Sequence, residues 1–328
     1  MKQLGSVLKR VPRTLLALVL LLLLFTAIKP AFLSGYNIMN ILRAGSILLV
    51  AATGMTIVII SGQIDISIGG IITLCSVLTA MFLKQYEDPT ALQIVLAFVL
   101  SASIGAVCGA FEGLLTGVFQ FNYWLVTFAN MSITYGLAKA VTDGGIISDF
   151  SKSFRWVSTG KVAGFSMCII FAAIFCLLMI LFFNHSRFGL HIYAIGNSEP
   201  AAANAGIRVK WNRLAAYALC GLMSGIAAVL LTARTNSSGA TIGEGYEFMA
   251  IAAVVIGGTP MDGGKGGLTG TILGTFFIAA LKNGLQVIGL DNFWQQFCLG
   301  VIIVAIIVYD VVSNTARVKT DMRRTYHD

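Results

Sequence analysis

The amino-acid sequence predicts an all-α integral membrane protein with about ten transmembrane helices, some of them short or interrupted. Hydrophobic residues make up 57% of the chain and charged residues only 11%, compared with about 25% charged residues in a typical soluble domain. A soluble chain of 328 residues could not cover its surface with 22 basic and 14 acidic side chains. Several apolar runs reach or approach the roughly 20 residues that cross the hydrocarbon core of a bilayer. The expected solvent of this chain is therefore lipid.

The apolar runs predict a single transmembrane domain over the whole chain, 1–328. The first run follows Lys9, Arg10 and Arg13, as the apolar part of a signal peptide would. No cleavage site of small residues follows it, so we expect a retained first span. All five prolines lie at or between the ends of the predicted spans, where they do not interrupt a helix. The ten predicted spans are 14–28, 44–60, 67–84, 91–118, 123–142, 163–183, 214–233, 248–258, 267–283 and 294–312.

The basic residues predict a topology with both termini in the cytoplasm. With the N-terminus inside, the inner side receives more than half of the 22 lysines and arginines, including the four in segment 184–213. Segment 184–213 is the longest polar interruption and is expected inside, whereas segment 143–162 is expected outside. This asymmetry explains the net charge of +8 better than nucleic-acid binding does, so we expect no nucleic-acid partner.

The cysteines and histidines predict neither a metal site nor a disulfide framework. All six cysteines lie within apolar runs, and the three histidines lie on loops or the tail without the spacing of metal ligands.

Glycines recur at a spacing of four in two predicted spans. This spacing puts each set on one face of a helix, where small residues let helices approach closely in lipid. We favour tight helix packing over substrate contact as the role of these glycines. The two sets are Gly105, Gly109, Gly113 and Gly117, and Gly266, Gly270 and Gly274.

Two polar segments, 61–70 and 257–267, interrupt the apolar pattern, and each contains one aspartate, Asp65 or Asp262. The favoured interpretation is that each aspartate caps the helix that follows. The alternative is that the segments are hinges lining a conduction path, because irregular backbone at membrane depth requires protein or a water-filled cavity around it. Glu112 lies inside a predicted span. It is either a functional intramembrane carboxylate or an interfacial acid paired with a nearby base.

The chain carries no signature of covalent chemistry, so we do not expect an enzyme. Segment 257–267 nearly matches a phosphate-binding loop, but Thr259 stands where the first glycine is required and Gly266 where Ser or Thr is required. Histidine, serine and aspartate do not form a plausible catalytic signature. Any energy source is therefore expected in another subunit.

Several motifs resemble the permeases of bacterial ABC importers for ribose, xylose, galactose and related monosaccharides. The most specific is the run Gly-Tyr-Glu at 245–247, Ala-Ile-Ala-Ala-Val-Val-Ile-Gly-Gly-Thr at 250–259 and Gly-Gly-Lys-Gly at 263–266. The segment Ser-Gly-Gln-Ile-Asp-Ile-Ser-Ile-Gly at 61–69 resembles the family's Gly-Gly-Ile-Asp-Leu-Ser-Val-Gly. The resemblance extends over about 35–312. The chain departs from the family pattern at Gln63, Glu112, Met249, Lys282 and the short segment 119–122, which lacks the customary basic residue.

The resemblance implies a multi-pass protein of the bacterial cytoplasmic (inner) membrane that imports a monosaccharide by alternating access. It implies three partners: a second permease copy, a cytoplasmic ABC ATPase that holds ATP and Mg²⁺, and an extracytoplasmic sugar-binding protein. No cofactor is expected on this chain itself. An ion-coupled secondary transporter of a small polar solute is the alternative, for which Glu112 is the best candidate residue.

Segment 184–213 is then expected to dock the ATPase through a short helix around 198–205. The expected docking residues are Asn197, Ser198, Glu199, Ala201, Ala202, Asn204 and Gly206. Polar side chains at span breaks or ends are the candidates for the translocation path, namely Gln63, Asp65, Asn283 and Gln296.

Overall fold

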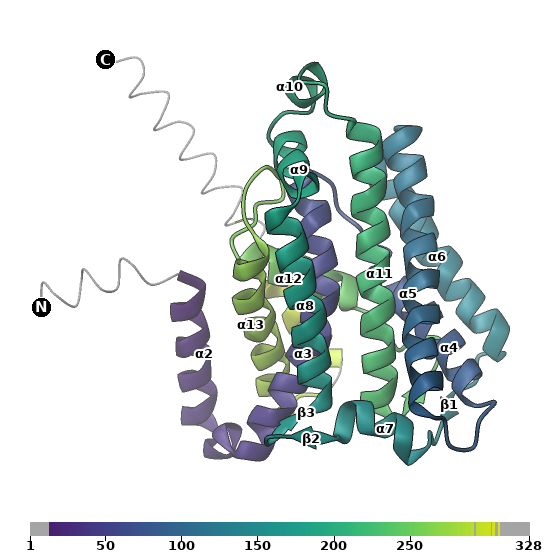
Figure 1. Cartoon of the computed structure of the whole chain (residues 1–328). Helices are drawn as coiled ribbons and strands as arrows, with labels where there is room; N and C mark the ends of the chain where they lie inside the picture. Colours follow the sequence, from purple (N-terminus) through teal and green to yellow (C-terminus); the bar gives the residue numbers. More distant parts are fainter. Residues whose placement is uncertain (1–12, 292, 303, 306–307, 309–328) are drawn as a thin grey trace, which may run out of the picture.

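The structure is a computed structural model that describes residues 13–291, 293–302, 304–305 and 308. Regular structure in these residues is almost entirely helical, with two short two-stranded sheets. Most helices run between two ends of a bundle (Figure 1). We call these the α10 end and the α7 end, after the short helices α10 (Glu199–Asn204) and α7 (Lys152–Thr159).

The helix α3 (Gly35–Ile60) forms the centre of the bundle. The helix α2 (Arg13–Ile28) and the 3₁₀ turn η1 (Pro30–Leu33) precede it, and the Ser34 side chain caps its first turn by accepting a hydrogen bond from the backbone of Asn37. The most apolar window of α3 is 89% buried, and the helix packs against α8, α11, α12 and α13. Its hydrophobic side chains therefore build the protein core rather than face lipid.

The next long helices, α5 and α6, pack on α11 and α4. The helix α5 (Ala91–Gly113) starts at a capping box between Thr90 and Gln93 and continues as the π-helix η2 (Leu114–Val118). The helix α6 (Tyr123–Thr142) follows, and the Asn122 side chain caps it.

Short strands close the α7 end. β1 (Ile147–Ser148) pairs antiparallel with β4 (Ser237–Ser238), and β2 (Lys161–Val162) pairs antiparallel with β3 (Phe165–Ser166). The α7 helix lies between β1 and β2 in the chain. The β1–β4 pair joins the loops that follow α6 and α11.

The α10 end is built by the segment between two long helices. The helix α8 (Met167–His185) is followed by α9 (Arg187–Asn197) and α10, after which α11 (Val209–Thr235) returns to the α7 end (Figure 1).

Two short helices, α4 and α12, lie inside the bundle. The helix α4 (Ile68–Leu83) has 16 residues and α12 (Tyr246–Ile256) has 11. At 1.5 Å per residue they are about 24 and 16 Å long, less than the roughly 30 Å of a hydrocarbon core. Both start inside the bundle; α4 runs to the α7 end, whereas α12 runs to the α10 end, from which α13 (Leu268–Val287) returns. A further apolar helix covers Phe293–Ile302.

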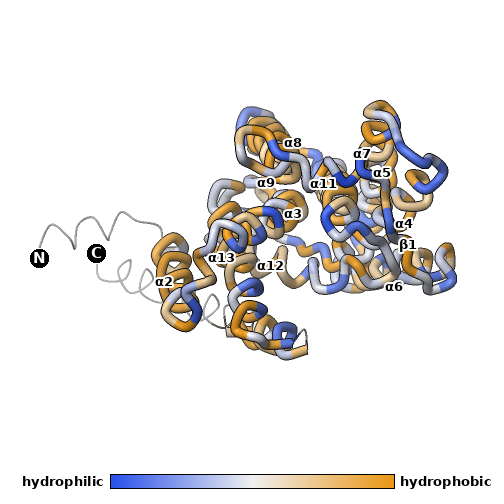
Figure 2. Tube along the Cα trace, turned by 90° about the horizontal axis from the view of Figure 1, so that it is seen from below, coloured by the Kyte–Doolittle hydropathy of each residue, from blue (hydrophilic) through white to orange (hydrophobic). Residues whose placement is uncertain are grey.

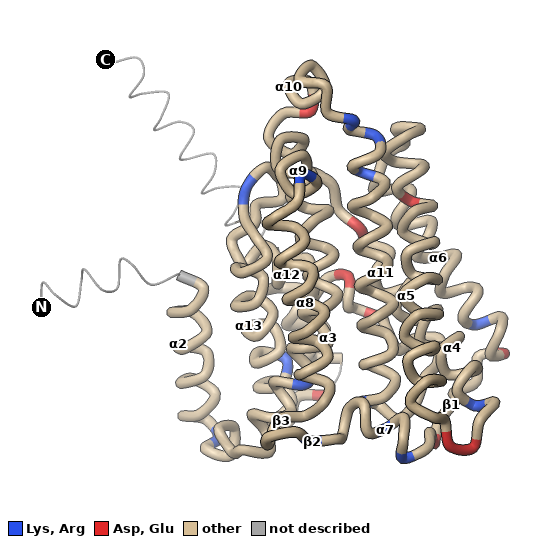
Figure 3. Tube along the Cα trace, in the orientation of Figure 1, with Lys and Arg blue, Asp and Glu red and all other residues tan. Residues whose placement is uncertain are grey.

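The outer surface suits lipid. Five helices of the described residues are long and apolar enough to cross a membrane, namely α3, α5 with η2, α8, α11 and α13. Figure 2 shows hydrophobic residues around the outside of α2, α5 and α8, which expose leucines such as Leu20, Leu92 and Leu178. Basic residues gather mainly toward the two ends in Figure 3.

The mostly helical, membrane-spanning fold is confirmed, whereas ten crossings and cytoplasmic termini stay predictions. Segment 184–213 differs from an ordinary solvated loop, because α9 buries Ile192 and Ile195. The helix expected from residue 163 starts only at Met167, since the β2–β3 hairpin occupies 161–166. Most of the basic residues at both termini, and the end of the last predicted span, lie outside the described residues.

The first glycine set packs α5 against α11, as predicted. A Cβ on Gly105 would collide with the carbonyl oxygen of Gly221, and one on Gly221 would collide with that of Gly105. A Cβ on Gly109 would likewise collide with the carbonyl oxygen of Tyr217. In the second set, Gly274 lies against the carbonyl oxygen of Ala253 and so packs α13 on α12.

Substituting Gly221→Ala should lower the thermal stability of the purified protein. The added methyl group can be accommodated only if α5 and α11 separate, and such overpacking costs about 1–3 kcal/mol. Gly136→Ala is the matched control, because Gly136 also lies within a helix but has no atom within 4 Å of its would-be Cβ. Equal melting temperatures of the two variants in detergent would contradict this account.

Candidate functional site

An exposed helical turn forms the tip of the α10 end. The Ser198 side chain caps α10, with its hydroxyl oxygen 3.4 Å from the backbone nitrogen of Ala201, and Pro200 occupies the first turn. Gly206 follows with a φ of 81°, a backbone conformation that favours glycine. Among the predicted docking residues, Asn197, Ala201, Asn204 and Gly206 are exposed, Ser198 and Glu199 are half-buried, and Ala202 is buried.

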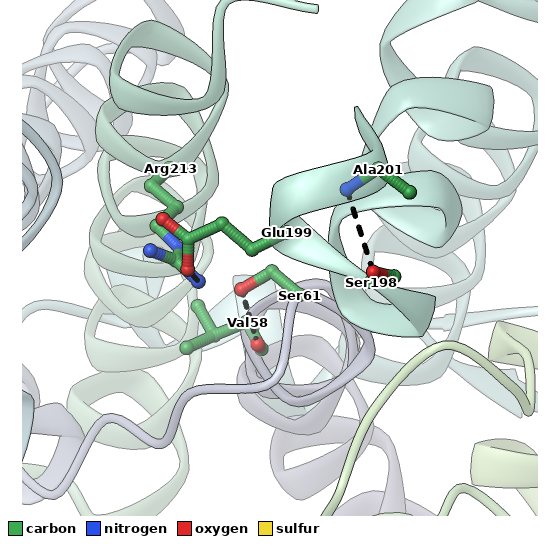
Figure 4. Close-up of polar contacts among 6 residues, drawn as sticks. All are labelled: Val58, Ser61, Ser198, Glu199, Ala201 and Arg213. Carbon is green, nitrogen blue, oxygen red and sulfur yellow. Dashed lines mark hydrogen bonds and ion pairs between the residues drawn. The ribbon is translucent and has the colours of Figure 1, made fainter. Parts of the chain in front are cut away.

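An ion pair fixes α10 to α11. Arg213 Nη2 lies 2.7 Å from Glu199 Oε2, and Figure 4 shows the two side chains facing each other beside Ser61. The side chain of Arg213 is only 12% exposed and that of Glu199 is 42% exposed. Arg213 therefore positions α10, in addition to any effect of its charge on topology.

Three segments meet through their backbones behind α10. Gly264 N donates a hydrogen bond of 2.9 Å to the carbonyl oxygen of Ile60, the last residue of α3. A Cβ on Gly196, near the end of α9, would collide with the same oxygen and lie 2.5 Å from Gly264 N. Tyr193 Oη also donates to the carbonyl oxygen of Gly266 over 2.9 Å. We call Ile60, Gly196 and Gly264 the glycine junction; it links α10 to both helix breaks.

The two aspartates at the breaks have different roles. Asp65 Oδ1 accepts hydrogen bonds from the backbone nitrogen and the hydroxyl of Ser67, at 2.8 and 2.7 Å. Asp65 therefore closes the turn before α4 rather than capping the helix as expected, because the N-cap residue is Ser67, whose side chain makes no capping hydrogen bond. The expectation for Asp262 is wrong, because α13 starts only at Leu268, beyond the reach of that side chain. The hydroxyl oxygen of Thr259 accepts a 3.2 Å hydrogen bond from the backbone nitrogen of Gly267, the residue before α13.

Glu112 is completely buried at 0% exposure. Its Oε1 accepts a 2.8 Å hydrogen bond from Asn130 Nδ2, and its carboxyl group lies near that of Asp65. No base forms an ion pair with Glu112 in the described part of the chain. Glu112 instead joins α5 to α6, beside the start of α4.

The candidate path residues do not come together. Gln63 and Asp65 are both buried before α4. Asn283 instead accepts a 2.8 Å hydrogen bond from Asn37 Nδ2 near the start of α3, toward the α7 end, and Gln296 is exposed on the helix after α13.

Comparison with known proteins places the chain in a family. Residues 37–307 match the family described as the permease component of branched-chain amino acid transport systems. The chain belongs to this family. No solved structure matches it.

Relatives of the permease are sugar importers by name. It is 36% identical to the ribose import permease protein of Bacillus subtilis over 302 residues, 90% of this chain and 91% of the relative. It is 32% identical to the ribose import permease protein of Escherichia coli K12 over 307 residues, 91% and 92% of the two chains. It is 33% identical to the galactose/methyl galactoside import permease protein of Haemophilus influenzae over 307 residues, 89% and 91% of the two chains.

Two features of the permease were not predicted from its sequence. Nothing in the sequence signals that Asp65 and Glu112 are neighbours, because they belong to different spans. Glu247 appeared only as part of a family motif, although its position directly before the predicted short span 248–258 could have marked it.

Glu112→Gln should keep the stability of the permease or raise it, whereas Glu112→Ala should lower it by about 1–3 kcal/mol. Glutamine still accepts from Asn130 and supplies an N–H where two carboxyl groups now meet. Alanine leaves the Asn130 amide without its acceptor in a buried place. Thermal unfolding in detergent tests this, and an equal loss in both variants would refute it.

Proposed function

We propose that the permease is the membrane subunit of an ATP-driven importer that moves a ribose-, xylose- or galactose-like monosaccharide into the cytoplasm by alternating access. This proposal rests on the comparison with known proteins, which gives the family of the chain and relatives named for ribose and galactose import. The exposed α10 helix, tied to both helix breaks, supports it.

Three partners complete the proposed importer in the bacterial cytoplasmic (inner) membrane. A cytoplasmic ABC ATPase holds ATP and Mg²⁺ and docks on α10. A second permease copy, identical or related, pairs with this one. An extracytoplasmic sugar-binding protein delivers the sugar at the α7 end. This arrangement requires ten crossings and both termini on the cytoplasmic side, which we retain as part of the proposal.

The glycine junction supports α10 as the docking element. ATP can shift the balance between two conformations only through contacts that differ between them. Gly196 of α9, two residues before Ser198 and α10, lies against backbone atoms of Ile60 and Gly264. A movement of α9 and α10 would therefore displace the end of α3 and segment 257–267, which follows α12. A docked ATPase would therefore move the half-helices without an intervening flexible side chain.

Uptake by the reconstituted complex tests the proposal against an ion-coupled transporter. A further relative, 28% identical over 298 residues, is named the D-allose transport system permease protein of Escherichia coli K12. We expect uptake of labelled D-ribose, D-galactose or D-allose into proteoliposomes with ATP and Mg²⁺, and none with a non-hydrolysable ATP analogue. Uptake that follows a proton or sodium gradient without ATP would overturn it.

Tryptophan at exposed positions of α10 should prevent ATPase binding. Ala201→Trp and Asn204→Trp place a large ring on the proposed docking surface, and we expect at least a tenfold loss of co-purified ATPase, or about 1.4 kcal/mol. Glu87→Trp is the control, because Glu87 is exposed at the α7 end. Full ATPase recovery with both α10 variants would remove α10 as the docking element.

Gly196→Ala should separate ATPase binding from transport. The methyl group would push α9 away from Ile60 and Gly264 while α10 stays exposed. We expect the ATPase to co-purify normally but uptake per ATP hydrolysed to fall several-fold. Gly35→Ala is the control, because no atom lies within 4 Å of its would-be Cβ; unchanged coupling in Gly196→Ala would show that the junction transmits nothing.

A further inference from the structure

The first turns of the half-helices α4 and α12 lie against each other inside the bundle. Gly243 N donates a 3.0 Å hydrogen bond to Thr73 Oγ1, and the same hydroxyl donates to the carbonyl oxygen of Gly69 over 2.9 Å. A Cβ on Gly243 would collide with the carbonyl oxygen of Gly69. The positive ends of two helix dipoles therefore meet at one point, in the arrangement by which discontinuous helices bind polar solutes near the bilayer midplane.

Two polar side chains reach this point and leave oxygen atoms without partners. Glu247, in the first turn of α12, is 4% exposed; its Oε1 accepts a 3.2 Å hydrogen bond from Gly245 N. Within the described part of the chain, Glu247 Oε2 and Tyr135 Oη are buried and have no hydrogen-bond partner. Both atoms lie next to Gly69, where a Cβ would collide with Oε2 and lie 2.8 Å from Oη.

These unpartnered atoms point to a ligand. A buried polar atom without a hydrogen bond costs about 1–3 kcal/mol, and more when it is charged. Such atoms are rare in native proteins and call for a functional explanation. A carboxylate oxygen accepts hydrogen bonds, while a phenol hydroxyl both donates and accepts. A molecule with several neutral hydroxyl groups can donate to the carboxylate oxygen and can both donate to and accept from the phenol hydroxyl.

The surroundings fit a sugar rather than an ion. Tyr135 contributes an aromatic ring whose hydroxyl group lies beside Gly69. Aromatic surface suits the C–H faces of a sugar ring, and mostly apolar walls with few polar groups are usual in small-molecule sites. No group of three or more metal-binding side chains is found among the described residues.

We propose that Glu247 and Tyr135 form a sugar-contact site on the translocation path, at the meeting point of α4 and α12. The inference rests on the proposed function and assigns two residues to its translocation path. The Glu247 carboxylate now fills the space that glycine leaves at position 69, so the sugar reaches the two oxygens only when α4 and α12 separate. Such a contact is transient and weak, which suits passage rather than storage.

The test compares uptake by reconstituted wild-type and variant complexes, with the binding protein, using whichever of labelled D-ribose, D-galactose and D-allose the wild type transports. Glu247→Gln and Tyr135→Phe should each reduce the maximal uptake rate about tenfold, the effect of losing one charge-assisted hydrogen bond. The apparent KM should stay constant because the binding protein sets it. ATPase co-purification and thermal stability should also stay at the wild-type level.

Two nearby substitutions serve as controls. Glu244→Gln changes an exposed acid before α12, and Gly136→Ala changes the residue beside Tyr135 where the space is free; both should transport normally. Gly69→Ala should reduce uptake as Glu247→Gln does, because it displaces the same carboxylate.

Each outcome decides the matter. Wild-type uptake rates in both Glu247→Gln and Tyr135→Phe would overturn the inference and leave the proposed function intact. A loss of thermal stability that parallels the loss of uptake in both variants would also overturn it, since the residues would then be structural. If the wild type transports none of the three sugars with ATP, the proposed function fails and the site fails with it.

Discussion

The carbonyl oxygen of Ile60 is the atom on which the arrangement of the α10 end depends. It ends the central helix, accepts a hydrogen bond from Gly264 and lies against Gly196. Only residues without a Cβ fit at the last two positions, so three chain segments touch with no side chain between them. Side chains absorb small displacements by changing rotamer, whereas close backbone contacts do not. A movement of α9 and α10 is therefore passed directly to α3 and to segment 257–267.

Short polar side chains make the helix breaks possible. An unbroken helix satisfies its own backbone groups, but a half-helix that starts inside the membrane leaves its first N–H groups without partners. Asp65 accepts the N–H of Ser67, the residue before α4, and Thr259 accepts the N–H of Gly267, the residue before α13. Thr73 accepts the N–H of Gly243 in the segment that leads to α12. Because each acceptor belongs to the segment it serves or to its direct neighbour, the half-helices keep their form while the surrounding long helices hold them in place.

The elements that could be predicted from the sequence were those that local pattern determines. Apolar runs long enough for lipid marked the main helices, and glycines at a spacing of four marked the contact between α5 and α11. Asp65 was expected to cap α4, but it lies two residues before the N-cap residue Ser67 and accepts the N–H of that residue instead. Asp262 carried the same pattern but is separated from α13 by a glycine-rich loop, whose shape depends on contacts with α3 and α9. The length of that loop depends on these tertiary contacts, so it could not be predicted from local sequence.

The candidate site was harder to predict, because its residues come from different spans. Glu112 and Asp65 meet only through the packing of α5 on the start of α4, and both are fully enclosed at 0% exposure. Glu247 and Tyr135 also meet across helices, but Tyr135 is only half-buried, and Glu247 stands in the sequence between the exposed Glu244 and Phe248. The first pair therefore lies wholly inside the protein, whereas the second lies where the two short helices α4 and α12 meet. An acid that a solute can reach must lie at such a seam, since only there can a small movement of the helices uncover it.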